Sequence, residues 1–171
     1  HTWRGKGVYF VENLEVSGPG SLHQAFEDAK QVGGGYIIPR VSGVLDASAM
    51  RLELRRANGI YFAGQAGPGP LLIVGSDSGC VNFSDSTDLL VRYLSVLHQP
   101  PSAESSLDAV EVFNATDVYL NHLDAGRGID EALSAVVTNY EKQSGRITID
   151  WNLFMEMDPD HTTGSLTGGL G

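Results

Sequence analysis

The stretch VYLNHLDA, residues 118–125, has counterparts on both sides of it in the chain. IYFAG begins at residue 60, LLVRYLSV at residue 89 and ITIDWNLF at residue 147, so the four segments start at equal intervals. Within each segment apolar residues alternate with others, which is the pattern of a β-strand with one buried face. A second ladder, Val81 and Phe83 followed by Val110 and Val112, has the same spacing. Each repeat therefore holds at least two short strands.

Short strands at a fixed spacing, with no helix between them, indicate a parallel β-helix, a solenoid in which each repeat is one coil. Coils stack roughly 4.8 Å apart, so residues one repeat apart lie over each other. A β-sandwich is the alternative, but it does not account for three equal spacings. The sequence predicts an all-β solenoid with coils of about 29 residues, in one domain spanning residues 1–171.

The same alternation predicts which side chains point into the solenoid. The predicted inward columns are Val91, Leu120 and Ile149 and, two residues further on, Tyr93, His122 and Trp151. His122 is thus expected to be a stacked core residue rather than a catalytic base. The column between them, Arg92, Asn121 and Asp150, is expected to form a polar ladder that faces solvent.

The segment SGPGSLHQAFEDAK, residues 17–30, breaks the strand pattern. Ser21 and Gln24 have the spacing of a capping box, and the apolar residues that follow fall on one helical face. These are Leu22, Ala25, Phe26 and Ala29. A short amphipathic helix is expected here, closing the first coil of the solenoid as such folds require at their ends.

The other end of the chain has no such cap. HTTGSLTGGLG, residues 161–171, begins what reads as another coil and stops. The C-terminal coils are therefore expected to be missing, so that the chain is truncated. An open last coil exposes strand edges, so self-association through it is expected.

Composition excludes several classes of partner. The formal net charge is −10, and no basic patch is available to neutralise the phosphates of nucleic acid. The longest apolar runs, such as residues 71–74, are far too short to cross a bilayer. The single Cys80 rules out an internal disulfide.

Several stretches resemble the pectate lyases and related polysaccharide lyases, in order and spacing, from about residue 8 to the end of the chain. They include VENLEVSGPGSLHQAFEDA from residue 11, IYFAGQAGPGP from residue 60, DAVEVFNATDVYLNH from residue 108, GIDEALSAV from residue 128 and ITIDWNLFMEM from residue 147. The resemblance implies a right-handed parallel β-helix and a secreted protein. It also implies cleavage of polygalacturonate, an acidic polysaccharide, by calcium-assisted β-elimination.

The resemblance implies a calcium site made by Asp108, Asp130 and Glu131. β-Elimination removes a proton beside a uronate carboxylate, and a bound Ca²⁺ can neutralise that carboxylate and act as a Lewis acid. Asp108 precedes one strand, and the two later acids precede the equivalent strand of the next coil. Stacked carboxylates repel each other unless a cation lies between them. The alternative is that all three are solvated acids at loop ends.

The chain also departs from the family pattern. Ser106 and Ser134 stand where some members have further acids, which predicts weaker calcium binding. The family's catalytic arginine follows GSLTGG, and no residue of this chain occupies that position, so no catalytic residue is assigned. Two functions stay open: part of a pectate-lyase-like enzyme, inactive by itself, or a non-catalytic module that binds an acidic polysaccharide.

Overall fold

The computed structural model describes residues 4–75, 80–99, 108–128, 131–136, 146–155 and 169–170. Within these ranges the chain forms fourteen strands, one α-helix and one 3-10 helix. In chain order the elements are β1 (Val8–Val11), α1 (Leu22–Gln31), β2 (Gly35–Pro39), β3 (Gly43–Ala47), β4 (Leu52–Glu53), β5 (Asn58–Ala63), η1 (Gly64–Ala66), β6 (Leu71–Gly75), β7 (Val81–Asn82), β8 (Thr87–His98), β9 (Val110–Phe113), β10 (Thr116–Gly126), β11 (Leu133–Val136), β12 (Ile147–Asp150), β13 (Leu153–Met155) and β14 (Gly169–Leu170).

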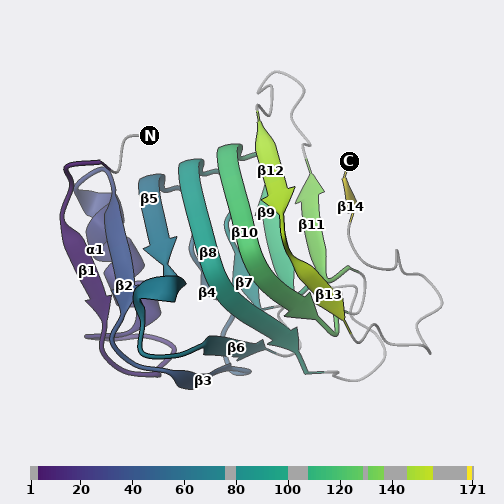
Figure 1. Cartoon of the computed structure of the whole chain (residues 1–171), viewed down its shortest axis with the longest axis horizontal. Helices are drawn as coiled ribbons and strands as arrows, with labels where there is room; N and C mark the ends of the chain where they lie inside the picture. Colours follow the sequence, from purple (N-terminus) through teal and green to yellow (C-terminus); the bar gives the residue numbers. More distant parts are fainter. Residues whose placement is uncertain are drawn as a thin grey trace.

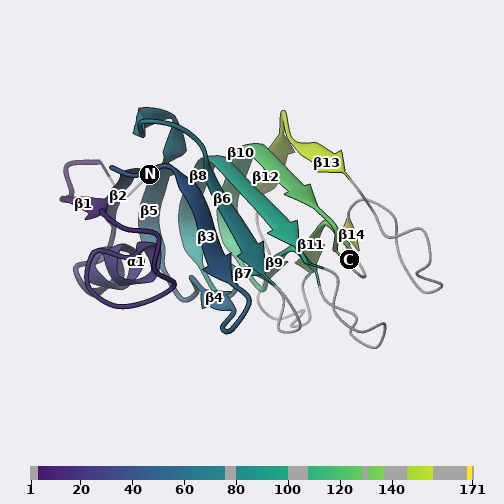
Figure 2. The same ribbon diagram turned by 90° about the horizontal axis from the view of Figure 1, so that it is seen from below.

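The strands stack into a solenoid of about four turns of roughly 29 residues (Figures 1 and 2). The larger sheet, sheet A, runs in the order β1-β2-β5-β8-β10-β12, and β3, β6 and β13 extend it around a corner. The smaller sheet, sheet B, runs in the order β14-β11-β9-β7-β4 on another side of the coils. Strand pairs such as β8 with β10 are parallel, as the predicted β-helix requires.

The predicted central column of the core is confirmed. Val91 pairs with Leu120, and Leu120 pairs with Ile149, in adjacent parallel strands of sheet A. Val91 and Leu120 are fully buried, and the half-buried Ile149 packs against the core. The equal spacing of these three residues in the sequence is thus the spacing of consecutive coils.

The prediction that Tyr93, His122 and Trp151 point into the core is wrong. Tyr93 is 41% exposed and Trp151 is 79% exposed, while His122 is half-buried. All three residues have left-handed backbone conformations, with φ of 56°, 56° and 54°. A left-handed residue bends the strand and shifts the alternation by one position, so in β8 the next buried residue after Val91 is Leu94. This column marks a corner of the solenoid.

The predicted polar ladder is present beside this corner, but its middle member is not exposed. Arg92 Nε donates to Asn121 Oδ1 at 2.8 Å, and Asn121 Nδ2 donates to the main-chain oxygen of Asp150 at 3.1 Å. Asn121 is only 3% exposed. Its buried amide is therefore satisfied by the coil on each side, as a buried polar group must be.

Helix α1 lies at the N-terminal end of the solenoid, against β1, β2 and β5 (Figure 2). Its buried residues are Leu22, Ala25, Phe26 and Ala29, the face that the sequence predicts. Ser21 Oγ accepts a hydrogen bond from the Gln24 N–H at 3.1 Å, which is one half of the capping box. The other half is not made, because Gln24 Nε2 instead donates to Asp28 Oδ1 at 2.7 Å.

Sheet B does not keep the same spacing throughout. Val81 pairs with Val110, one full repeat later in the sequence, but Val110 pairs with Leu133, which comes sooner than a full repeat. In sheet A, the same coil keeps the full spacing, since Val118 pairs with Ile147.

Among the described residues, none of the helical segments is long and apolar enough to cross a membrane.

Candidate functional site

The outward side of sheet B carries a column of polar side chains. Glu53 pairs with Asn82, Asn82 with Glu111, and Glu111 with Ser134, in four successive strands. The residue just before each of them in its strand points inward. These four residues are fully buried: Leu52, Val81, Val110 and Leu133. The alternation of a strand thus separates a polar column from the core, and two members of that column, Asn82 and Ser134, are themselves buried.

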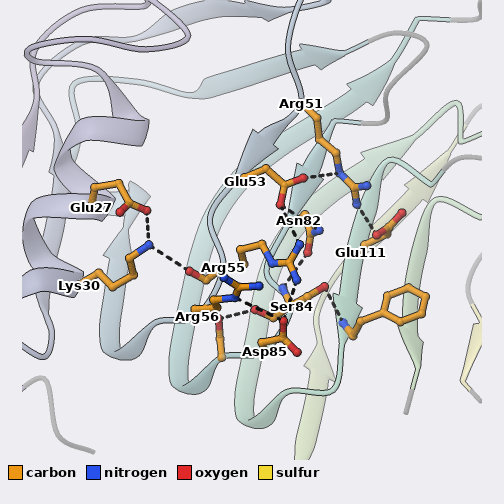
Figure 3. Close-up of polar contacts among 12 residues, drawn as sticks. Glu27, Lys30, Arg51, Glu53, Arg55, Arg56, Asn82, Ser84, Asp85 and Glu111 are labelled. Atoms are coloured by element: carbon orange, nitrogen blue, oxygen red, sulfur yellow. Dashed lines mark hydrogen bonds and ion pairs between the residues drawn. The ribbon is translucent and has the colours of Figure 1, made fainter. Parts of the chain in front are cut away.

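Charged side chains flank this column and link the coils. Arg51 makes an ion pair with Glu111, and its Nε lies 3.7 Å from Glu53 Oε1 (Figure 3). The Arg51 and Glu111 side chains are only 18% and 15% exposed. We call the outward surface around Arg51, Glu53, Arg55, Asn82, Asp85 and Glu111 the sheet B face.

A second group of contacts lies further along the sheet B face. Arg55 Nη2 lies 2.7 Å from Asp85 Oδ2, and Arg55 Nη1 lies 3.5 Å from Glu53 Oε2 (Figure 3). The hydrogen bond to Asp85 raises the pKa of Arg55 above its ordinary value, so this guanidinium stays charged. Arg56 Nε lies 3.9 Å from the same Asp85 oxygen, and its side chain is 72% exposed.

A shallow cavity of about 280 Å³ opens on the sheet B face. Its lining includes Arg55, Asn82, Asp85, Glu111 and Asn114. Asn82 is held in place, because its Nδ2 donates to Glu53 Oε2 at 3.3 Å and its Oδ1 accepts from the Ser84 N–H at 2.8 Å. The cavity therefore presents a guanidinium, an amide and carboxylates in fixed positions.

Asp108 lies where β9 and β11 begin, and it joins the two coils. Its Oδ1 accepts a hydrogen bond from the Glu131 N–H at 2.9 Å, and its Oδ2 accepts one from the Ser134 hydroxyl. Asp108 is 8% exposed. Ser134 is one of the positions where the family pattern has a further acid. Here a hydroxyl donor takes that place and satisfies the neighbouring carboxylate.

Of the three predicted calcium ligands, the structure places Asp108 and Glu131 next to each other, while Asp130 lies outside the described residues. In the described part of the chain, no three or more His, Cys, Asp or Glu side chains come together as a metal site. Both oxygens of Asp108 already accept hydrogen bonds from protein donors. The described residues do not by themselves supply the oxygen ligands that Ca²⁺ requires, and the predicted site stays a prediction.

In the GRGIDE stretch, residues 126–131, close approach of the backbone explains why residue 128 is glycine. A Cβ on Gly128 would lie 1.8 Å from the Glu131 main-chain oxygen. That oxygen accepts a hydrogen bond from the Ala109 N–H at 3.2 Å, next to Asp108 in the preceding coil. Only glycine at position 128 leaves room for this approach to the Glu131 main chain.

Sequence reasoning missed the arginines of the sheet B face. The signal was present in RLELRR, residues 51–56, where Arg51, Glu53 and Arg55 alternate with Leu52 and Leu54. The two leucines are buried and the three charged residues are outward, as a half-buried strand predicts. The run is short, and it precedes the first of the four repeated segments, which begins at residue 60.

Comparisons with known proteins agree with this architecture. No family model matches the chain. The chain is 26% identical, over 163 residues, to a protein of Emericella nidulans described as probable pectate lyase C. The aligned region covers 95% of this chain and 35% of that protein, so the chain spans about a third of its relative's length. Together with the stacked coils, this similarity identifies the chain as a pectate-lyase-like parallel β-helix.

Proposed function

We propose that the chain is part of a pectate-lyase-like enzyme that acts on polygalacturonate, and that the sheet B face binds the polymer. The similarity to probable pectate lyase C supports the substrate class. The observation that carries the proposal is a cluster of three arginines on this face, in a chain whose net charge is −10. Arg51, Arg55 and Arg56 are linked to one another through the carboxylates that they share, at Glu53, Asp85 and Glu111.

An acidic protein binds an acidic polymer only where its positive charges make contact. Guanidinium groups suit uronate carboxylates, because their planar fork can donate two parallel hydrogen bonds. Arg55 and Arg56 are the more exposed of the three, and both lie near one carboxylate, Asp85. A uronate that adds beside Asp85 would share these two guanidinium groups with it.

The extended shape of sheet B suits a polymer. Its strands stack across the coils, so equivalent positions repeat along the solenoid at roughly 4.8 Å. The column from Glu53 to Ser134 gives a row of polar side chains in this direction. Calcium belongs to the proposal through Asp108, Asp130 and Glu131, and when bound it would neutralise uronate charge.

Binding of a short oligogalacturonate, measured by calorimetry without calcium, tests the role of the sheet B face. We expect Arg55→Ala to weaken binding about tenfold and Arg55→Lys to weaken it less, because lysine keeps the charge but not the fork. Arg146→Ala is the matched control, since Arg146 is 80% exposed and pairs with Asp117 at 2.5 Å outside this face. Equal affinities for all three variants would show that the arginines of the sheet B face do not bind the polymer.

Calcium is tested separately, by titrating the metal into wild type and Asp108→Ala. We expect a saturable heat that the substitution abolishes. Identical heats from the two proteins would rule out Asp108 as a ligand. A control variant, Glu12→Ala, removes an exposed acid that pairs with Arg40 at 3.3 Å, outside the sheet B face.

The alternative, a non-catalytic module that binds an acidic polysaccharide, makes the same binding predictions. Turnover by the purified chain, measured as the absorbance of unsaturated product with polygalacturonate and calcium, would exclude this alternative. We expect no turnover from this chain alone, because no residue matches the family's catalytic arginine.

Secretion and self-association through the last coil remain predictions. Sedimentation at several protein concentrations tests self-association.

A further inference from the structure

A second cavity, of about 300 Å³, opens at the corner of sheet A where the strands turn. Its floor includes Tyr93 and Ser95 of β8 and His122 and Asp124 of β10. The loop after β5 supplies the other wall, with Gln65 and Pro70 among its lining residues. The cavity volume is at the small end of the range of ligand pockets, which suits one or two sugar rings.

This wall is formed by extra residues at this corner, between β5 and β6. Ala63 pairs with Arg92, and Leu72 pairs with Ser95, so the whole segment between Ala63 and Leu72 replaces the short turn between Arg92 and Ser95 in β8. This extra segment includes η1, between β5 and β6 in Figure 1. A Cβ on Gly64 would lie 2.0 Å from the Tyr93 main-chain oxygen, so the segment packs directly onto β8.

The floor is a ladder of stacked rings on the surface. The rings of Tyr93 and His122 are 4.5 Å apart between centroids and 17° from parallel. Those of His122 and Trp151 are 6.5 Å apart and 15° from parallel. The left-handed backbone here is a feature of the corners of the solenoid, since it recurs among the described residues in other columns such as Arg56, Asp85 and Asn114. What distinguishes this corner is that its left-handed positions carry rings.

The hydrogen bonds around His122 define which ring nitrogen carries a proton. Arg92 Nε can only donate, so the atom that it bonds to, Asn121 Oδ1, is an acceptor. The same oxygen lies 2.8 Å from His122 Nδ1, which must therefore donate. In the neutral ring, the other nitrogen, Nε2, is left as an acceptor for a hydroxyl group.

The polar groups of the cavity select against anions. Asp124 lines it and accepts a hydrogen bond from Ser95 Oγ at 2.9 Å, which fixes the carboxylate. A carboxylate accepts bidentate hydrogen bonds from two adjacent hydroxyls, as it does from arginine. Among the described residues that line the cavity there is no lysine or arginine to hold a uronate.

We propose that this corner cavity is a binding site for a neutral saccharide, with a sugar ring packed against the face of Tyr93 that does not stack on His122, and with its hydroxyls bonded to Asp124. The ring face of an aromatic residue attracts the weakly positive C–H groups of a sugar, just as it attracts the edge of another aromatic ring. The proposal does not rest on the proposed function of the sheet B face, because ligand charge, residues and location all differ.

Calorimetric titration of the chain with three neutral oligosaccharides, cellotetraose, xylotetraose and β-1,4-galactotetraose, tests the site. We expect saturable binding of at least one of them. Tyr93→Ala and Asp124→Asn should each weaken that binding roughly tenfold. Tyr119→Ala is the matched control, because Tyr119 is a half-buried tyrosine of β10 outside this cavity, and its affinity should equal that of wild type. NMR shifts of the Tyr93 and His122 rings in wild type, on adding sugar, locate the site without relying on a variant.

Absence of binding by all three sugars at about 10 mM, a concentration that saturates even weak sites, would overturn the proposal. So would binding that leaves the ring resonances of Tyr93 and His122 unchanged. If an oligogalacturonate competes for this cavity as well as the neutral sugars do, the inferred selectivity is wrong. The test of Arg55→Ala with oligogalacturonate fails or succeeds independently of these results.

Discussion

Asp108 connects two coils through its side chain. It accepts hydrogen bonds from the Glu131 N–H and the Ser134 hydroxyl and is 8% exposed. Asp108→Ala leaves both donors without their acceptor, so we expect the free energy of unfolding to fall by about 2–3 kcal/mol. Ser134→Ala should cost less, about 1–2 kcal/mol, because the Glu131 bond remains. Urea denaturation measures both, and a larger loss for Ser134→Ala would contradict this account.

Cys80 gives the chain a pH dependence on the alkaline side. Burial raises the pKa of its thiol from 9.0 to about 12. Below pH 9 both folded and unfolded chains keep the proton, so the stabilisation is complete. Between these two pKa values the unfolded chain loses the proton and the folded chain retains it, so stability falls as pH rises.

Comparing wild type with Cys80→Ala isolates this contribution. We expect the free energy of unfolding of wild type to fall more steeply between about pH 9 and pH 12 than that of the variant. Tyr119 also has a raised pKa, through its hydrogen bond to Asp150, and its contribution is common to both proteins. Parallel pH profiles would show that Cys80 does not contribute.

At the scale of elements, the N-cap of α1 makes only one of the two hydrogen bonds of a capping box. Ser21 bonds the Gln24 N–H, but the Gln24 side chain does not return a bond to Ser21. We expect Ser21→Ala to destabilise the chain by about 1 kcal/mol and Gln24→Ala to change stability by about 0.5 kcal/mol or less. Thermal unfolding of the two variants measures the difference, and equal losses would mean that both halves of the box form in solution.

The close approach of residue 128 to the Glu131 main chain depends on one glycine. In Gly128→Ala the new methyl would meet the Glu131 carbonyl at 1.8 Å, where the neighbour is backbone and cannot move aside. We expect a loss of about 3 kcal/mol or more in unfolding free energy. Gly7→Ala is the control, since its methyl would meet only side-chain atoms of Tyr9, none nearer than 3.3 Å. A fully stable Gly128→Ala protein would contradict this close approach.

The sequence predicted the elements well and their corners poorly. The regular spacing of the repeats correctly placed Val91, Leu120 and Ile149 in one column, because parallel coils repeat the same hydrophobic position. It failed two residues later, since period-two alternation holds only while the strand is straight. Tyrosine, histidine and tryptophan rarely adopt left-handed conformations, so nothing in the residue types announced a bend at Tyr93, His122 or Trp151.

The candidate site was predictable only where it involves repeated positions. The sequence places Asp108 and Glu131 before equivalent strands, and the main-chain N–H of Glu131 donates a hydrogen bond to Asp108. That their carboxylates share a cation stays a prediction. The ion pairs of Arg51 with Glu111 and of Arg55 with Asp85 connect different coils and depend on side-chain conformations. No local pattern in the sequence encodes such contacts.

At the scale of the whole molecule, the net charge of −10 opposes the approach of a polyanion. This repulsion acts over a Debye length of about 30 Å at 0.01 M salt but only about 8 Å at 0.15 M. The contacts of Arg55 and Arg56 act at shorter range. If the proposed function holds, added salt should therefore speed the association of oligogalacturonate, measured by stopped-flow fluorescence without calcium, by severalfold over this range. A rate that instead falls steeply with salt would mean that the arginines of the sheet B face, rather than the total charge, govern the encounter.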